Sequence, residues 1–511
     1  MTVNQKDDLL AMQELNEYWQ QQDFKLLPHQ YRTVTKVIKQ LDGRALLADE
    51  VGLGKTIEAG MILKEYLLRG LVETCLILTP VSLGFQWWRE LNDKFKINLY
   101  NNRKGKGWHY FNVIISSLDR AKREPHRSAI YKRGFDLVIV DEAHRLKNEA
   151  TMNWKFVNNI PKKYLLLLTA TPLQNDLKEL YNLINLLRPE LYQDYNDFKA
   201  RHVDGKRQIQ NLSMLQEQLS QVMIRNKRED FKLATDNNRE LELLPVELTT
   251  EERKLYEMIT KLVQQKYKSQ SSNSSFQLLT LQREVCSSSF AVAKSLQRML
   301  EKSQYQSIWT ELKDILKLAT EITNNQKLTV VKKIMAKTDT KVIIFTEYKA
   351  TQQYLGYNLY HQGYNPIFFS GDLSDSQKEW AKARFENEGD ILISTEAGGQ
   401  GINLQFCNTI INYDLPWNPM KLEQRIGRVD RLGQTNDVVV YNLITTETIE
   451  ERILALLFEK VDLFETVTGD QLQLLLNEKQ LENDELLSCS NQLTDIDYRA
   501  DLGQLREKYL H

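Results

Sequence analysis

Residues 46–60, LLADEVGLGKTIEAG, have the side chains and spacing best suited to binding a phosphate. An apolar run ends there in a glycine turn, and a helical pattern begins at Lys55. Gly52 and Gly54 can take backbone angles that aim successive N–H groups at an anion, and the helix dipole adds positive potential there. Lys55 would reach the β- and γ-phosphates of a nucleotide, and the Thr56 hydroxyl would bind Mg²⁺. The alternative is a plain surface turn between a strand and a helix.

A pair of carboxylates follows a second apolar run. Residues 135–140 (FDLVIV) have the pattern of a buried strand and lead directly into Asp141, Glu142 and His144. Open α/β sheets bind ligands at the carboxyl ends of their strands. Asp141 can hold Mg²⁺ through water, and Glu142 can orient and deprotonate an attacking water. Two solvated acids at a strand end are the alternative.

Gln30 lies just after a proline turn, at the start of a helical pattern over 31–41. Its amide both donates and accepts hydrogen bonds, so it could bind the edge of an adenine base. A polar residue in the first turn of a helix would have the same sequence pattern.

Three arginines near the C-terminal end of the chain repeat at three-residue steps. Arg425, Arg428 and Arg431 are therefore predicted to project from one side of a helix. Guanidinium groups aimed from one domain at a phosphate held by another form an arginine-finger arrangement. The alternative is a solvated basic helix face.

Two series of short apolar segments must position these groups. The first series runs over 74–80, 112–117, 135–140 and 164–170, and the second over 341–345, 365–369, 390–394, 409–412 and 438–443. Each series alternates with helical patterns, which predicts two parallel sheets in tandem. Residues 248–326 are helical by period, with a serine-rich loop predicted at 269–275. The fold class is therefore α/β, with a helical insertion between two sheets.

Length and composition agree with a multidomain globular protein. The 511 residues exceed one hydrophobic core, and 42% are hydrophobic while 26% are charged. The net charge of −1 restricts any nucleic-acid site to a local basic surface. The four cysteines show no metal or disulfide spacing, and no apolar run suggests a membrane segment, so a cytoplasmic location is expected. The predicted parts are 1–23 (leader), 24–235 (first lobe), 236–324 (insertion), 325–465 (second lobe) and 466–511 (tail).

The ordered motifs resemble a known family. The series LPHQ, DEVGLGKT, LILTP, DEAH, LTATPLQN, VIIFTEY, STEAGGQGINL, DLPWNP and QRIGRVDRLGQ is similar to that of superfamily 2 helicases of the Swi/Snf type, and most similar to the bacterial RapA-like branch. The resemblance covers about 24–235 and 325–465 and implies two RecA-like lobes that bind ATP and Mg²⁺. Asp49 stands where a strict P-loop has glycine, which is usual for this branch.

The resemblance also implies which residues form the site. Glu142, Lys55, Arg428 and Arg431 would be catalytic, and Thr56 and Asp141 would hold the metal. The nucleotide would be bound by Gln30, Asp49, Glu50, Val51, Gly52, Leu53, Gly54, Lys55, Thr56, Gln424, Arg428 and Arg431.

The function implied by the resemblance is an ATP hydrolase that moves on duplex DNA and displaces bound proteins. Contacts with the duplex backbone are assigned to Lys104, Lys106 and residues 225–228, and no protein partner is assigned. One alternative is an RNA or single-strand helicase in which Trp87, Trp88 or Trp417 stacks on bases, although adjacent helix residues cannot share a face and one of the pair is expected in the core. Another is a nucleotide-gated subunit of a defence or remodelling complex with little turnover of its own.

Overall fold

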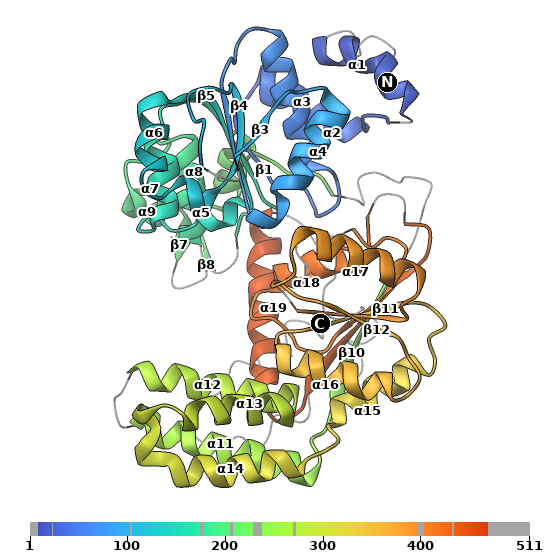
Figure 1. Cartoon of the computed structure of the whole chain (residues 1–511). Coiled ribbons are helices and arrows are strands. Elements are labelled where there is room, and N and C mark those ends of the chain that lie inside the picture. The colour runs from blue at the N-terminus through green and yellow to red at the C-terminus, as the bar shows by residue number, and fades with distance from the viewer. Residues whose placement is uncertain are drawn as a thin grey trace. The chain divides into compact units, whose positions relative to one another are not determined.

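The computed structural model of the chain consists of two compact units (Figure 1). The first comprises Met1–Ala234 with Leu463–Asp470, and the second is built on Thr235–Asp462. The structure describes residues 9–22, 24–102, 105–173, 177–204, 208–227, 238–268, 272–395, 403–431 and 434–468. The two predicted series of apolar segments thus fall in separate units.

A parallel sheet forms the centre of the first unit, with its described strands in the order β3-β4-β2-β5-β6-β1-β9. Its central strands are short, largely apolar runs in which most residues are buried, as parallel sheets require. They are β1 (Arg44–Leu47), β2 (Cys75–Thr79), β3 (Tyr100–Asn101), β4 (Val113–Ser117), β5 (Phe135–Asp141), β6 (Lys162–Leu168) and β9 (Met223–Ile224). The phosphate-loop strand β1 is separated from the carboxylate strand β5 only by β6.

Helices cover both faces of this sheet (Figure 1). One face packs against α1 (Leu10–Gln21), α2 (Pro28–Lys39), α3 (Lys55–Leu68) and α4 (Gly84–Phe95). The other side carries α5 (Leu118–Ala121), α6 (His126–Arg133), α7 (Met152–Asn159), α8 (Leu177–Leu187) and α9 (Tyr195–His202). The antiparallel pair β7 (Val203–Asp204) and β8 (Gln208–Ile209) follows α9 in the chain. Helix α10 (Leu212–Ser220) comes after this pair and leads to β9.

The leader segment is part of the first unit. Leu9, Leu15 and Trp19 are buried in the core that α1 shares with α3. The backbone N–H groups of Leu10 and Ala11 donate to the Glu65 carboxylate of α3 at 3.1 and 2.8 Å. A carboxylate at the first turn of α1 compensates its unpaired N–H groups and so fixes where the helix starts.

The second unit has its own parallel sheet, in the strand order β10-β15-β14-β11-β13-β12. These strands are β10 (Arg239–Val246), β11 (Val342–Thr346), β12 (Pro366–Phe369), β13 (Ile391–Thr395), β14 (Thr409–Asn412) and β15 (Val438–Thr445). One prediction was wrong here, because 236–324 was assigned to a helical insertion and yet 239–246 pairs with β15 along its whole length. The sequence RELELLPV alternates at its start, and Leu241, Leu243 and Val246 of this edge strand are buried.

The second sheet is also covered on both faces (Figure 1). Helices α17 (Asp375–Asn387), α18 (Pro419–Ile426) and α19 (Ile449–Thr468) pack on one face. Helices α15 (Gln326–Met335) and α16 (Lys349–Tyr360) pack on the other. Two parallel sheets in tandem, each covered by helices, confirm the predicted fold class.

The helical insertion is a bundle of α11 (Thr250–Lys268), α12 (Ser272–Ser287), α13 (Ser289–Leu300) and α14 (Trp309–Glu321), which shares one apolar core. A capping box begins α11, because the Thr249 hydroxyl accepts from the Glu252 N–H while the Glu252 carboxylate accepts from the Thr249 N–H. The loop predicted at 269–275 was wrong for 272–275, which belong to α12, and residues 269–271 lie outside the described part. Ser272, Ser274 and Ser275 therefore lie in the first turn of α12.

In the described ranges, no helix is both long enough and apolar enough to cross a membrane.

Candidate functional site

The glycine turn between β1 and α3 has the backbone geometry of a phosphate cradle. Gly52 and Gly54 have φ angles of 90° and 92°, in the left-handed region that side chains disfavour. Gly54 is the N-cap of α3, so the first N–H groups of this helix face the turn. The Lys55 ammonium donates to the carbonyls of Asp49 and Glu50 at 2.6 and 3.0 Å, and its burial lowers the pKa of this lysine. The cradle thus has an ordered loop with a cation at its rim.

Gln30 contacts the cradle directly. Its Nε2 donates to the carbonyl of Leu53 at 2.9 Å, and its Oε1 accepts from the Leu27 N–H at 3.0 Å. A side chain at position 54 would collide with this amide. The close contact is therefore a second reason, besides the φ angle, why this position requires glycine. One bond of Gln30 therefore caps its own helix, as the plain alternative proposed, while the other braces the phosphate loop.

Asp49 lies beneath the cradle and is completely buried. Its carboxylate accepts three hydrogen bonds from Asn226, one from the backbone N–H and two from the amide, at 2.9–3.0 Å. Nearby Glu58 is also buried, and no donor in the described ranges reaches either of its carboxyl oxygens. Burial and the Asp49 charge raise the pKa of Glu58 well above its usual range. When Glu58 is protonated, its single O–H can donate to the Asp49 carboxylate.

His29 completes this buried group, because ligand atoms of His29, Asp49 and Glu58 all lie within 4.8 Å of one another. The ring Nε2 of His29 is 3.0 Å from the Leu53 carbonyl. A proton shared between the two carboxyl groups accounts for the cluster without a cation. The cluster therefore supports the shape of the cradle.

The carboxylate pair lies at the tip of β5. Glu142 has a left-handed backbone (φ 52°, ψ 50°), which is costly for a residue with a side chain and is typical of functional sites. Its Oε2 lies 3.1 Å from Nδ1 of His144. Burial and the neighbouring Glu142 raise the pKa of Asp141 to about 6. Asp141 and Thr56 offer the hard oxygen donors that Mg²⁺ prefers, so both residues suit the metal role predicted for them.

The sequence did not single out the donor that binds Asp141. Nε1 of the buried Trp87 donates to Oδ2 of Asp141 at 2.7 Å, and the Glu142 N–H donates to Oδ1 at 2.8 Å. The expectation that one of the two adjacent tryptophans lies in the core is confirmed, because Trp87 is 1% exposed while Trp88 is partly exposed. Trp87 is consequently not available for stacking on bases.

Hydrogen bonds form within the segment that follows β6 and between that segment, Arg225 and the tip of β1. The Thr171 N–H donates to the Thr169 hydroxyl at 3.0 Å, and both threonines are buried. Arg225, a predicted DNA contact, instead turns its guanidinium inward to the carbonyls of Ala48 and Ala170 and lies over the ring of Phe464. This arginine therefore joins the tips of β1 and β6.

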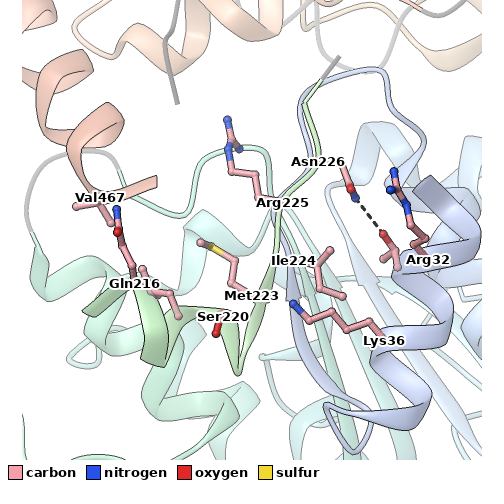
Figure 2. Close-up of a pocket in the computed structure, with 11 residues that line it drawn as sticks. Arg32, Lys36, Gln216, Ser220, Met223, Ile224, Arg225, Asn226 and Val467 are labelled. Carbon is pink, nitrogen blue, oxygen red and sulfur yellow. Dashed lines mark hydrogen bonds between the residues drawn. The ribbon is translucent and has the colours of Figure 1, made fainter. Parts of the chain in front are cut away.

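A pocket of about 600 Å³ lies along the edge strand β9 (Figure 2). Lys36 of α2 points its ammonium into the open space, and Asn226 links this wall to the cradle through Asp49. Arg32 and Lys36 add positive charge to the lining, which favours an anionic group, whereas the Arg225 guanidinium is bound to the carbonyls of Ala48 and Ala170. The lining consists of Arg32, Thr33, Lys36, Gln216, Leu219, Ser220, Met223, Ile224, Arg225, Asn226 and Val467.

Other predicted contacts have mixed outcomes. Lys106 is exposed, as a backbone contact requires, whereas Lys104 and Arg228 lie outside the described residues. The glycine-rich segment 396–402 lies outside them as well. Trp417 is 39% exposed and packs against the Arg283 guanidinium.

The arginine prediction in the second unit was partly wrong. Helix α18 ends at Ile426 with Gly427 as its C-cap, so Arg428 and Arg431 follow it in a turn and do not share a helix face with Arg425. Arg425 is 4% exposed and donates to Asn412 and to the carbonyl of Asp414 at 2.9 Å. Its role is therefore structural.

The two remaining arginines sit in an ordered turn together with Gln424 at the end of α18. Nε of Arg431 donates to the Gly427 carbonyl at 2.8 Å, and Gln424 and Arg431 are partly exposed while Arg428 is 8% exposed. Arg239, at the start of β10, fixes this turn with ion pairs to Glu423 at 3.2 Å and Asp430 at 2.6 Å. Burial would lower the pKa of Arg239, but these two carboxylates outweigh it and raise the pKa.

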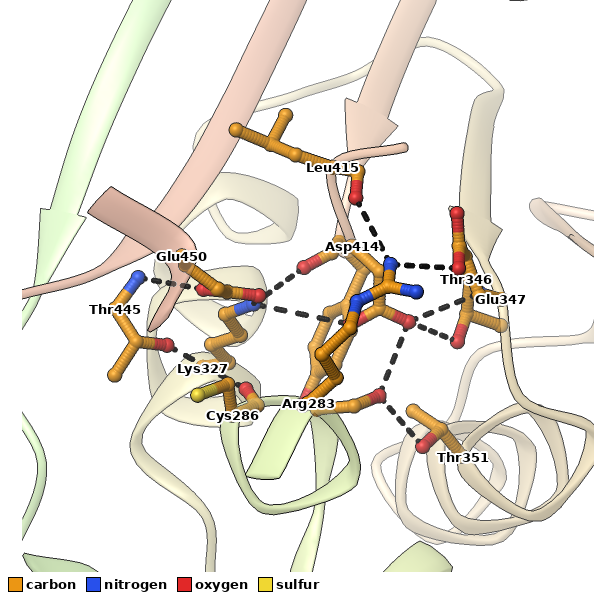
Figure 3. Close-up of polar contacts among 12 residues, drawn as sticks. Arg283, Cys286, Lys327, Thr346, Glu347, Thr351, Asp414, Leu415, Thr445 and Glu450 are labelled. Atoms are coloured by element: carbon orange, nitrogen blue, oxygen red, sulfur yellow. Dashed lines mark hydrogen bonds and ion pairs between the residues drawn. The ribbon is translucent and has the colours of Figure 1, made fainter. Parts of the chain in front are cut away.

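A buried polar network joins the insertion bundle to the second sheet (Figure 3). Oδ2 of Asp414, in the DLPWNP motif, accepts from Ser287 of the bundle at 3.0 Å and from Thr346 at 2.6 Å. Lys327 pairs with Glu450 at 2.7 Å and lies 3.8 Å from Asp414. Bundle and sheet are therefore one body around this motif.

Comparisons with known proteins agree with this geometry. A family model described as SNF2-related domain matches residues 29–291, and one described as helicase conserved C-terminal domain matches 326–433. The chain is 46% identical over 463 residues to an uncharacterized ATP-dependent helicase of Bacillus subtilis, YqhH, covering 90% of this chain and 82% of that protein. It is 28% identical to the RNA polymerase-associated protein RapA of Actinobacillus pleuropneumoniae, covering 81% of this chain and 48% of RapA. The Hef helicase domain of Pyrococcus furiosus shares the fold, with a TM-score of 0.50 at 16% identity, covering 87% of this chain and 99% of that chain.

Proposed function

Because this chain belongs to the SNF2-related helicase-type ATPases, we propose that it couples ATP hydrolysis to movement along duplex DNA and thereby displaces bound proteins. The observation that carries the proposal is the juxtaposition of two strand tips in one sheet. The cradle after β1 and the carboxylates after β5 flank the same strand, β6. A nucleotide held by the first lies within the reach of the second.

The chain's own residues divide the chemistry between them. Backbone N–H groups of the cradle and Lys55 bind the phosphates, and Glu142 accepts a proton from the attacking water. Thr56 and Asp141 would hold Mg²⁺, which when bound neutralises charge on the phosphate oxygens. Arg428 and Arg431 stabilise charge that develops on the transferred phosphoryl group, and Gln424 assists in binding.

Duplex DNA is the proposed track. The Bacillus subtilis relative is described as a helicase, and another relative is named a chromodomain-helicase-DNA-binding protein in humans. Stacking of single-stranded bases is less well supported, because Trp87 is buried and Trp417 already packs against Arg283. Backbone contacts without base stacking suit a motor that leaves the duplex intact.

The steady-state ATPase rate separates the candidate functions. The pure chain is measured alone and with duplex DNA, single-stranded DNA or RNA, and duplex DNA should stimulate it most. Stimulation should fall steeply with salt, because phosphate contacts release counterions. Glu142→Gln should abolish turnover, whereas the control Glu149→Gln, which alters a nearby surface pair with Lys178, should not.

Strand displacement provides the second measurement. The chain should remove the third strand from a DNA triplex in an ATP-dependent reaction and leave a forked duplex paired. Fork unwinding without triplex displacement would contradict translocation and favour a strand-separating helicase. A rate that no nucleic acid stimulates would favour a nucleotide-gated subunit of a larger complex.

A further inference from the structure

Helix α4 buries one of two adjacent tryptophans against the carboxylate strand. Trp87, Leu91 and Phe95 are spaced four residues apart, and all three are buried in the hydrophobic core of the first unit. Trp88 is only partly buried; it packs against the same core and stacks on Phe85, with ring centroids 5.8 Å apart. The neighbours therefore have different environments on the same helix.

The indole N–H of Trp87 ends on the metal-binding carboxylate. Oδ2 of Asp141 accepts from this N–H at 2.7 Å, while Oδ1 accepts from the Glu142 backbone at 2.8 Å. A carboxylate has about four acceptor positions, so two are used and two stay available to a cation or its water ligands. Two donors on different oxygens allow one orientation of the carboxyl plane.

Burial alone does not account for this contact. A core position needs an apolar ring, which phenylalanine supplies, whereas a buried indole also needs an acceptor for its N–H. The acceptor here is one of the two acids on which hydrolysis depends. Groups that hydrogen-bond to a metal ligand orient that ligand, and their loss typically lowers metal affinity or activity by about 10–100-fold.

We propose that Trp87 is a positioning residue, whose indole N–H holds the Asp141 carboxylate in the orientation that binds the metal of the bound nucleotide. The inference rests on the proposed ATPase site and names a residue of α4 as part of it. Since β2 lies beside β5 in the parallel sheet, the segment that follows β2 can reach the β5 tip.

The test measures metal binding apart from turnover. In the full-length chain carrying Glu142→Gln, which blocks hydrolysis, the affinity for Mn²⁺ in the presence of ATP is measured by electron paramagnetic resonance. Trp87→Phe should weaken Mn²⁺ binding by about 10–100-fold. The matched control Trp88→Phe should leave it unchanged, and Asp141→Asn should weaken it at least as much as Trp87→Phe.

Turnover gives a second, distinct readout. With Glu142 intact, Trp87→Phe should raise the Mg²⁺ concentration for half-maximal ATPase, and excess Mg²⁺ should restore kcat. A loss of kcat that Mg²⁺ does not restore would show that the ring is needed only for packing. If Trp87→Phe does not fold, the indole ¹H–¹⁵N resonance of Trp87 in the chain with Glu142→Gln decides, because it should shift when ATP and Mg²⁺ are added together.

The outcomes separate this inference from the proposed function. Unchanged Mn²⁺ affinity in Trp87→Phe, with a loss in Asp141→Asn, would overturn the role of Trp87 and leave the metal assignment intact. Unchanged affinity in both variants would overturn the assignment of Asp141 itself. An indole resonance that does not respond to metal and nucleotide would also refute the inference.

Discussion

Glu284 places a carboxyl group between α12 and α13 of the insertion bundle, where it is 7% exposed. Its Oε1 accepts from the Ser295 hydroxyl at 2.7 Å, and in the described ranges no donor reaches its Oε2. Burial raises the pKa of Glu284 to about 7, because the Ser295 hydroxyl and Arg298 offset only part of the desolvation. Glu284→Gln keeps the shape of the side chain and removes its ionisation.

The raised pKa makes stability depend on pH. In the unfolded chain the carboxyl ionises near its usual 4.5, whereas in the folded bundle it keeps its proton up to about 7. The stabilising contribution is fully present below pH 4.5 and is lost as the pH rises through about 7. Each pH unit between 4.5 and about 7 lowers the free energy of unfolding of the wild type by about 1.4 kcal/mol. The wild type therefore loses about 3 kcal/mol of stability over this range, and the glutamine variant does not.

Urea unfolding of both proteins between pH 5 and pH 8, followed by far-ultraviolet circular dichroism, measures this effect. The stability of Glu284→Gln relative to wild type should rise by about 2 kcal/mol from pH 5 to pH 7 and then level off. Glu257→Gln, at an exposed position of the same bundle, should show no such rise. The argument fails if the two glutamine variants have parallel pH profiles.

Four substitutions test the site and the turn beside it. Lys55→Ala and Glu142→Gln should both abolish turnover, but only Glu142→Gln should still bind a fluorescent ATP analogue, because it leaves the cradle charge in place. Arg431→Ala should reduce kcat about 10³-fold with little change in ATP affinity, and equal losses of both would indicate a role in binding or folding. Arg239→Ala should destabilise the second unit by about 3–5 kcal/mol in urea unfolding, because Glu423 and Asp430 lose their partner; a change below about 1 kcal/mol would contradict that role.

The sequence was sufficient to predict both sheets, because their strands are short apolar runs that end in turn residues. Strands β2 and β11, for example, lie within one residue of the predicted 74–80 and 341–345. Edge strands were harder to find. Strand β9 has only two residues, and β10 alternates like a half-buried strand inside a region assigned to helices.

The phosphate loop could be predicted in detail because its requirement is local. Positive φ angles at Gly52 and Gly54 follow from the absence of a side chain, whatever the rest of the fold does. The arginine series was harder, since a three-residue spacing fits both a helix and the turn that follows it. Gly427, a residue typical of helix ends, was the signal that α18 stops before Arg428.

Residues that hold the site residues in place could not be predicted from their spacing in the sequence. The order of the strands in the sheet decides which of these residues contact the site. Trp87 follows β2 and reaches Asp141 at the tip of the adjacent β5. Asn226 follows β9 and in the same way reaches Asp49 at the tip of β1.

Arg239 also reaches its partner through the order of the strands, but at the start of its strand. It begins β10, which lies beside β15, and it pairs with Asp430 in the segment that leads to β15. In each case one group belongs to a motif, and its partner lies at an end of the neighbouring strand or in the segment that follows that strand, which no motif covers. Variants at the partner positions should therefore alter metal binding or turn geometry while every motif residue stays unchanged.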